Sequence, residues 1–187
     1  MATVAELVED ISEIMGVKPE TVNAYARALI DSGDLPKSRG RAIAHVEVEH
    51  IVKLFLAVAI APKIKNAAIE VHKYFEMSRA GYPGGLQSED RVIAGKEICA
   101  VVETILTYDE NASDEEKEFR KQCILSQIAI TLNWQEIEIH IREGILRFKD
   151  GGDPNYWGGY VKRTVTISGQ AFGMLGHANG RDYVKES

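Results

Sequence analysis

The sequence predicts an α+β protein, in which a mainly helical N-terminal part precedes a C-terminal part that combines helices with a small antiparallel sheet. Apolar residues recur at helical spacing through residues 4–60. Between Ile128 and Ile141 apolar and polar residues alternate instead, which is the period of a half-buried strand. The 187 residues are 45% hydrophobic and 27% charged, a composition typical of a soluble globular protein with one medium domain or two small ones.

Two short helices joined by a tight turn are predicted at the N-terminus. The first ends at Gly16, because a small residue favours a helix C-terminal cap. Pro19 suits the first position of the second helix, where its missing N–H costs nothing, and Gly33 ends that helix. The two apolar faces consist of Val4, Leu7, Val8, Ile11 and Met15, and of Val22, Tyr25, Ala26, Leu29 and Ile30.

A third helix is expected from His45 to Ala61. It is apolar on most of its sides, which indicates that it is buried on more than one of them. Pro62 ends it, and the polar stretch of Lys63, Lys65 and Asn66 follows. We therefore expect a module of residues 1–61 and a second part of residues 66–187.

The second part contains three longer predicted helices, a short final one and four predicted strands. A capping box of Ser113 and Glu116 marks the start of one helix, which runs to about Cys123. The other two helices are expected over residues 66–80 and 89–108, and the strands over 128–134, 136–142, 145–148 and 161–167. Ser168 is expected to cap a short final helix, and the glycine-rich stretches 81–85 and 150–154 are loops by composition.

The N-terminal helical hairpin and the basic loop after it resemble the winged helix-turn-helix modules of bacterial and phage regulators. The residues that carry this resemblance are Gly16, Val17, Thr21, Val22, Asn23 and the exit Ser32-Gly33-Asp34-Leu35. The resemblance covers about the first quarter of the chain. It implies that residues 19–31 form a recognition helix in the major groove of DNA, and that the loop Lys37–Arg41 is the wing.

The resemblance also implies that the partner is double-stranded DNA and that the site residues lie on these two elements. Asn pairs with adenine and Arg with guanine through two hydrogen bonds, while Thr reaches a base or a phosphate. Three cations within the loop 37–41 suit a phosphate or minor-groove contact. The expected DNA-binding residues are Lys18, Thr21, Asn23, Arg27, Lys37, Arg39 and Arg41.

The charge of the chain limits how it could bind DNA. The formal net charge is −6, and residues 1–61 hold six Lys or Arg against nine Asp or Glu. One such module would contact few phosphates and bind weakly through counterion release. DNA binding would therefore require several modules, so we expect a homodimer or a larger homo-oligomer.

No combination of residues in the sequence indicates an enzyme, a metal site or a cofactor. Glu136, Glu138 and His140 share one strand face and are the most metal-like set, but a solvated sheet face is the favoured interpretation. A second acidic and histidine-rich cluster (His45, Glu47, Glu49 and His50) lacks the histidine spacing of a zinc helix. Neither a phosphate-binding loop nor a GxSxG nucleophile motif is present.

Three further features bear on partners and location. Residues 155–160, with Lys162 and Arg163, could stack on a base or anchor a partner, although a hairpin loop over the sheet edge is favoured. Cys99 and Cys123 are expected to be reduced core residues. The sequence has neither a membrane-length apolar run nor a secretory signal, so we expect a cytoplasmic location in a bacterium or a phage-infected cell.

The sequence thus favours a DNA-binding transcriptional regulator whose C-terminal part serves oligomerisation or effector binding. One alternative is a small-terminase-like protein of phage DNA packaging, because such subunits also carry an N-terminal helix-turn-helix and assemble as rings. Another is a protein-interaction module, such as an inhibitor, that uses the fold without binding DNA. A dimer would favour the regulator, and a large ring would favour packaging.

Overall fold

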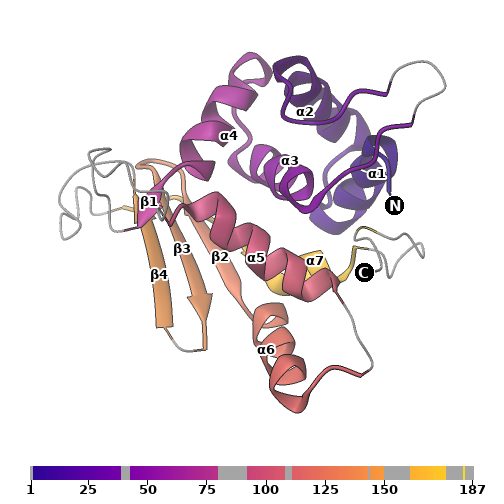
Figure 1. The fold of residues 1–187 in the computed structure, drawn as a ribbon. Helices are drawn as coiled ribbons and strands as arrows, with labels where there is room; N and C mark the ends of the chain where they lie inside the picture. The colour runs from indigo at the N-terminus through magenta and orange to yellow at the C-terminus, as the bar shows by residue number, and fades with distance from the viewer. Residues whose placement is uncertain are drawn as a thin grey trace.

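The computed structural model describes residues 2–38, 43–79, 92–107, 111–142, 144–149, 161–175 and 183. Helices α1 to α4, within residues 4–75, lie together on one side of the molecule, the sheet lies on the other, and α5 (Ala94–Leu106) runs between them (Figure 1). The chain is therefore a mixed helix and sheet protein, as the sequence predicts.

Helices α1 (Val4–Met15) and α2 (Pro19–Ser32) form the predicted hairpin. Thr3 and Glu6 form a capping box at the start of α1, in which the Glu6 carboxylate accepts a hydrogen bond of 2.8 Å from the Thr3 N–H. Gly16 and Gly33 end the two helices in the left-handed conformation, with φ of 63° and 87°, which a side chain would disfavour. The sequence signals for both helix ends are confirmed.

Helix α3 (Val48–Ile60) is the centre of the molecule, because almost every side of it is covered. It packs against α2 and α4 of the N-terminal group and also against α5 and strand β5. Phe55 of α3 lies 4.6 Å from Phe172 of the last helix, measured between ring centroids. These contacts cross the boundary that the sequence predicts at residues 62–66, and the buried apolar residues on both sides of it belong to one core cluster.

After α3 the chain reverses direction through Ala61, whose φ of 47° is positive. A short 3-10 helix, η1 (Ile64–Asn66), leads into α4 (Ala67–Phe75). The expectation that this helix continues to residue 80 is wrong, because Ser78–Arg79 form strand β1. Ser78 pairs with Lys149 of strand β4, and this long-range pairing overrides the local helical pattern.

Three more helices complete the helical part. Helix α5 (Ala94–Leu106) is buried along one face, and α6 (Asp114–Ile124) begins at the predicted capping box, in which Ser113 Oγ accepts a hydrogen bond of 3.2 Å from the Glu116 N–H. Ser168 caps the short α7 (Gly169–Gly173), also as predicted. Tyr183 is buried, and its hydroxyl donates a hydrogen bond to Asp10 of α1, which lies 173 positions earlier in the chain.

The sheet is antiparallel and has the strand order β1-β4-β3-β2-β5. Its longer strands are β2 (Gln127–Thr131), β3 (Glu136–Ile141), β4 (Gly144–Lys149) and β5 (Thr164–Ser168). One face is apolar and belongs to the core; its buried residues are Ile128, Ile130, Ile137, Ile139, Phe148 and Ile167. The opposite face carries the polar residues of the alternating pattern, including Glu136 and Glu138.

In the described ranges no helix is long and apolar enough to cross a membrane.

Candidate nucleic-acid interface

The turn between α1 and α2 is three residues long and is fixed by hydrogen bonds. Ser12 Oγ donates to the Val17 carbonyl oxygen at 2.7 Å, and the Val17 N–H donates to the Ser12 carbonyl at 3.1 Å. Buried apolar residues of α2 then hold it against α1 and α3 (Val22, Tyr25, Ala26 and Leu29). The outer side of α2 is consequently presented to solvent in a fixed orientation relative to the rest of the protein.

The predicted site residues of α2 lie on this outer side. Lys18, Thr21 and Arg27 are exposed, and Asn23 is partly exposed. Arg27 and Asn23 share a ridge with two acids, Glu20 and Asp31, because positions 20, 23, 27 and 31 recur at helical spacing. The face therefore offers both cations and hydrogen-bonding groups, and its acids oppose tight non-specific attraction to a polyanion.

The predicted wing falls only partly within the described residues. Lys37 is exposed, whereas Arg39 and Arg41 lie outside the described residues. Ser38 Oγ accepts a hydrogen bond of 3.1 Å from the Ala44 N–H, which joins the two described ends of this loop. His45 forms an isolated β-bridge with Thr3, but residues 36–38 and 43–45 contain no strand. The described part of the loop therefore does not form the β-hairpin of a wing.

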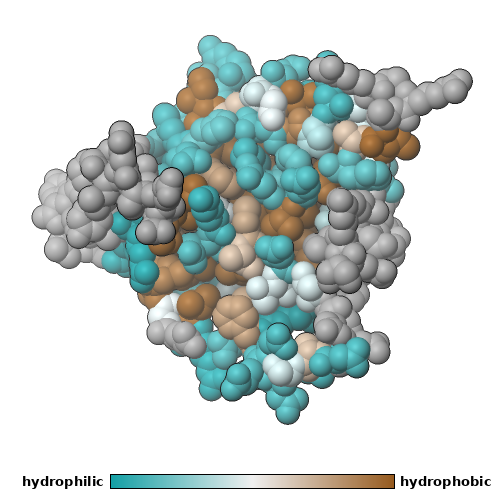
Figure 2. Space-filling view, in the orientation of Figure 1, coloured by the Kyte–Doolittle hydropathy of each residue, from teal (hydrophilic) through white to brown (hydrophobic). Residues whose placement is uncertain are grey.

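A groove of about 840 Å³ runs along the outer side of α2, between that helix and the η1–α4 segment. We call it the α2 groove; its lining residues are Glu20, Asn23, Ala24, Arg27, Ala28, Asp31, Ser32, Ile64, Lys65 and Ala68. The surface over α2 and α4 mixes hydrophilic residues with smaller hydrophobic patches (Figure 2). Sequence reasoning missed the far wall of this groove, because Ile64 and Lys65 read as a polar boundary between two parts of the chain.

The C-terminal end of α2 is tied to α3 and α4 by a buried ion pair. Asp34 is only 5% exposed, and its Oδ1 lies 3.0 Å from Lys53 Nζ of α3 and 2.8 Å from His72 Nε2 of α4. Ser32 donates a hydrogen bond of 2.6 Å to the other carboxylate oxygen, and Glu49 Oε1 lies 2.7 Å from Lys53 Nζ. We call this set the Asp34–Lys53 cluster, and it fixes where α2 lies relative to the two helices behind it.

The cluster keeps both of its buried groups charged. Burial by itself would raise the pKa of Asp34, but the Ser32 hydrogen bond and the Lys53 ammonium outweigh it and lower that pKa. Burial by itself would lower the pKa of Lys53, but the carboxylates of Glu49 and Asp34 outweigh it and raise that pKa. The one ammonium of Lys53 is shared between the carboxylates of Asp34 and Glu49, of which Asp34 is the buried one.

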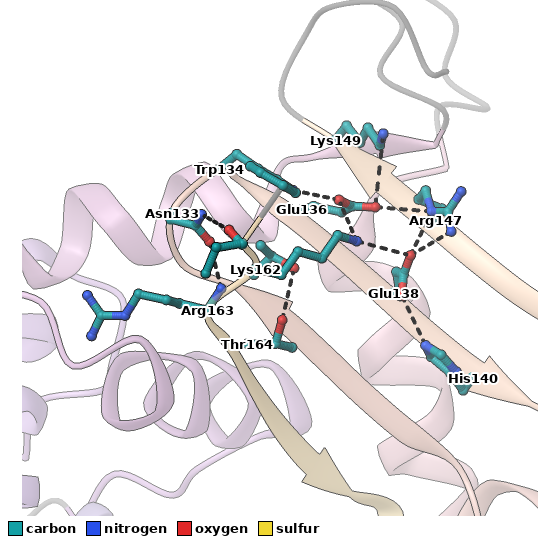
Figure 3. A network of polar contacts seen from close by, with 12 residues as sticks. Asn133, Trp134, Glu136, Glu138, His140, Arg147, Lys149, Lys162, Arg163 and Thr164 are labelled. Carbon is teal, nitrogen blue, oxygen red and sulfur yellow. Dashed lines mark hydrogen bonds and ion pairs between the residues drawn. The ribbon is translucent and has the colours of Figure 1, made fainter. Parts of the chain in front are cut away.

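A second polar network lies on the polar face of the sheet (Figure 3). Glu136 is fully buried and accepts a hydrogen bond of 2.9 Å from Trp134 Nε1. Its carboxylate also lies 3.0 Å from Arg147 Nε, 3.4 Å from Lys162 Nζ and 4.0 Å from Lys149 Nζ. Lys149 ends β4 and Lys162 precedes β5, so one carboxylate holds both ends of the connection between these strands.

Glu138 and His140 extend this network along β3. Arg147 Nε donates a hydrogen bond of 2.8 Å to Glu138, so its closeness to Glu136 is an ion pair and not a directed hydrogen bond. Burial would raise the pKa of Glu138, but Arg147 and His140 outweigh it and lower that pKa. Glu136, Glu138 and His140 do share a face, as predicted, yet cations occupy the positions that a metal would need. Across the described ranges no group of three His, Cys, Asp or Glu residues is placed to hold a metal ion.

Of the remaining candidates, residues 155–160 lie outside the described residues, whereas the cysteines and His50 have structural roles. Cys99 is partly buried and Cys123 buried, both as free thiols, and burial raises the pKa of Cys99 to about 12. At the start of α3, His50 Nδ1 accepts a hydrogen bond of 2.8 Å from the Glu47 N–H, so this part of the acidic and histidine-rich cluster caps a helix. Comparison of the chain with protein-family models, with curated proteins and with solved structures finds no significant match. The function of the chain is therefore inferred from the geometry and chemistry of its own residues.

Proposed function

We propose that this chain is a sequence-specific double-stranded DNA-binding protein, that it acts as a homo-oligomer in transcriptional regulation in a bacterium or phage, and that α2 is its recognition helix. The observation that carries the proposal is the exposed N-terminal half of α2, which follows a three-residue turn and is held rigidly from behind by α1 and α3. A rigid helix with polar side chains on its free face is the element that enters a major groove.

The side chains on this face have chemistry suited to base edges and phosphates. Asn23 can pair with adenine and Arg27 with guanine, while Thr21 can reach a base or a phosphate. Lys18 precedes the helix and Lys37 follows it, so both flank the ridge where the DNA backbone would pass. With few cations for each module, useful affinity requires two or more modules on one DNA, which is the reason for proposing a homo-oligomer.

The test is selection of DNA fragments from the source genome at two salt concentrations. The wild type should enrich a discrete site, and binding should weaken steeply as salt rises. Arg27→Ala should relax the sequence preference, whereas Lys117→Ala, on the exposed surface of α6, serves as the control for loss of a cation elsewhere. Absence of any DNA binding at low salt would overturn the proposal and favour a protein-interaction module.

Light scattering of the purified protein gives the accompanying oligomeric state. A dimer would agree with a regulator that binds two half-sites. A large ring would instead favour the packaging role, because several weak modules arranged around a ring could share one DNA. A strict monomer would contradict the homo-oligomer proposed here.

A further inference from the structure

The η1 turn beside α2 carries two lysines that the charge pattern of the sequence did not assign to any site. Lys63 and Lys65 are both exposed, and Lys65 lines the α2 groove on the wall opposite Arg27. Within the described part of the chain, neither lysine has an ion-pair partner. Two unneutralised ammonium groups therefore border the free face of the proposed recognition helix.

Hydrogen bonds fix the position of this turn beside α2. Tyr25 of α2 donates a hydrogen bond of 2.8 Å from its hydroxyl to the Pro62 carbonyl oxygen, and the Asn66 N–H donates to the Lys63 carbonyl at 2.8 Å. The reversal that brings η1 back along α2 passes through Ala61, a residue with a β-carbon in the left-handed region. This conformation is unfavourable for a residue other than glycine, so packing on both sides must enforce the path of the turn.

The charges around the groove favour an anionic partner despite the acidic chain. The described surface around α2 has five cations without ion-pair partners, and these are Lys18, Arg27, Lys37, Lys63 and Lys65. On the outer ridge of α2 the acids that oppose them are Glu20 and Asp31, while Asp34 is buried and paired with Lys53 behind that ridge. A carboxylate such as Glu20 is also compatible with a major groove, where it can accept a hydrogen bond from the amino group of cytosine.

We infer that Lys63 and Lys65 form a second phosphate-contacting wall, which grips the DNA backbone on the η1 side while α2 occupies the major groove. This inference rests on the proposed function and places a DNA phosphate strand against the η1 side of the α2 groove, while Asn23 and Arg27 on the α2 side face the bases. Lysine acts as a point charge toward phosphate, so the two residues add affinity without reading sequence. Their contribution should therefore be equal for preferred and unrelated DNA.

The test compares two double variants that lose the same number of cations. Lys63→Ala/Lys65→Ala removes the wall, and Lys117→Ala/Lys121→Ala removes two exposed lysines of α6. We expect the first double variant to make the slope of log K against log salt less steep by about 1.8 for each bound protomer. Binding at 0.1 M salt should weaken by up to about 60-fold. The control pair should change the slope little. Lys63→Arg/Lys65→Arg should retain the wild-type slope, and unfolding midpoints should show that all variants are folded.

The outcomes separate this inference from the proposed function. If the wild type binds DNA and the two alanine pairs have equal slopes, the second wall is refuted while recognition by α2 stands. The inference is also refuted if the wall variant loses affinity only for the preferred site, because the lysines would then read sequence. If the wild type shows no salt-dependent binding at all, the proposed function fails, and the inference fails with it.

Discussion

Replacing Lys53 by Met should strongly destabilise the protein, because it leaves the buried Asp34 carboxylate without its ammonium partner. Removing one member of a buried ion pair costs about 3–5 kcal/mol. Two other groups still contact Asp34, since Ser32 donates at 2.6 Å and His72 Nε2 lies 2.8 Å away, so the lower end of that range applies. Lys53 also lies 5.3 Å from the centre of the Phe75 ring, and the loss of this cation–π contact falls within the same range. The expected loss is therefore about 3 kcal/mol, a large part of the ~5–15 kcal/mol that stabilises a typical domain.

Urea unfolding followed by far-UV circular dichroism measures this loss. With a slope of about 2 kcal/mol per molar urea, the Lys53→Met midpoint should fall by about 1.5 M. Lys73→Met is the control, because Lys73 forms an exposed pair with Glu70 at 3.1 Å and its loss should cost less than about 1 kcal/mol. The double variant Lys53→Met/Asp34→Asn removes both buried charges and should recover much of the loss.

Two results would refute this reasoning. One is a loss below about 1 kcal/mol for Lys53→Met, which would mean that the carboxylate of Asp34 does not need its ammonium partner. The other is a double variant whose loss equals the sum of the two single losses, because independent sites add and coupled sites do not.

Three further predictions concern other single contacts. Tyr74→Phe removes the hydrogen bond of 2.9 Å from the buried hydroxyl to the Thr131 carbonyl, and chemical denaturation should show a loss of about 1–3 kcal/mol; an unchanged stability would contradict the α4–β2 tie. Ala61→Gly should increase the free energy of unfolding by up to about 1 kcal/mol and so raise the thermal midpoint slightly, because glycine adopts the left-handed conformation without strain. A lower midpoint would contradict the left-handed conformation of Ala61. Burial lowers the pKa of His50, so the unfolded state binds its proton more readily and stability should fall as the pH drops below about 6.5; in His50→Gln, whose side chain also accepts from Glu47, this part of the pH dependence should disappear.

Local signals in the sequence were sufficient for much of the fold. The ends of α1 and α2 follow from Gly16 and Gly33, since each adopts the left-handed conformation that a helix C-terminus favours. The capping box of Ser113 and Glu116 correctly places the start of α6. The alternating residues of β2 and β3 correctly separate the core face of the sheet from its polar face.

Features that depend on distant residues could not be predicted in this way. Strand β1 exists because Ser78 pairs with Lys149, about seventy positions along the chain, which no local pattern reveals. Glu136 reads as a solvated residue, but the register of β4 brings Arg147 to it, and the chain before β5 brings Lys162. The burial of Lys53 could not be predicted either, because its partner Asp34 lies on another element.

The same limit applies to the candidate interface. The exposed positions of α2 follow from its helical period, so the placement of Lys18, Thr21 and Arg27 on the surface could be expected. The α2 groove could not, because it requires the reversal at Ala61 that returns η1 alongside α2. A polar stretch that resembled a boundary in the sequence is, in three dimensions, a wall of this groove.

Recognition of DNA sequence by the free face of α2 is tested most directly by one affinity ratio. The ratio is the Kd for a scrambled duplex divided by the Kd for a site selected from genomic DNA, measured for the wild type and for Arg27→Ala at one salt concentration. If Arg27 pairs with a base, its loss should lower this ratio roughly 5-fold to 150-fold, which corresponds to about 1–3 kcal/mol of discrimination free energy. An unchanged ratio in Arg27→Ala, in Asn23→Ala and in Thr21→Ala would contradict recognition by α2.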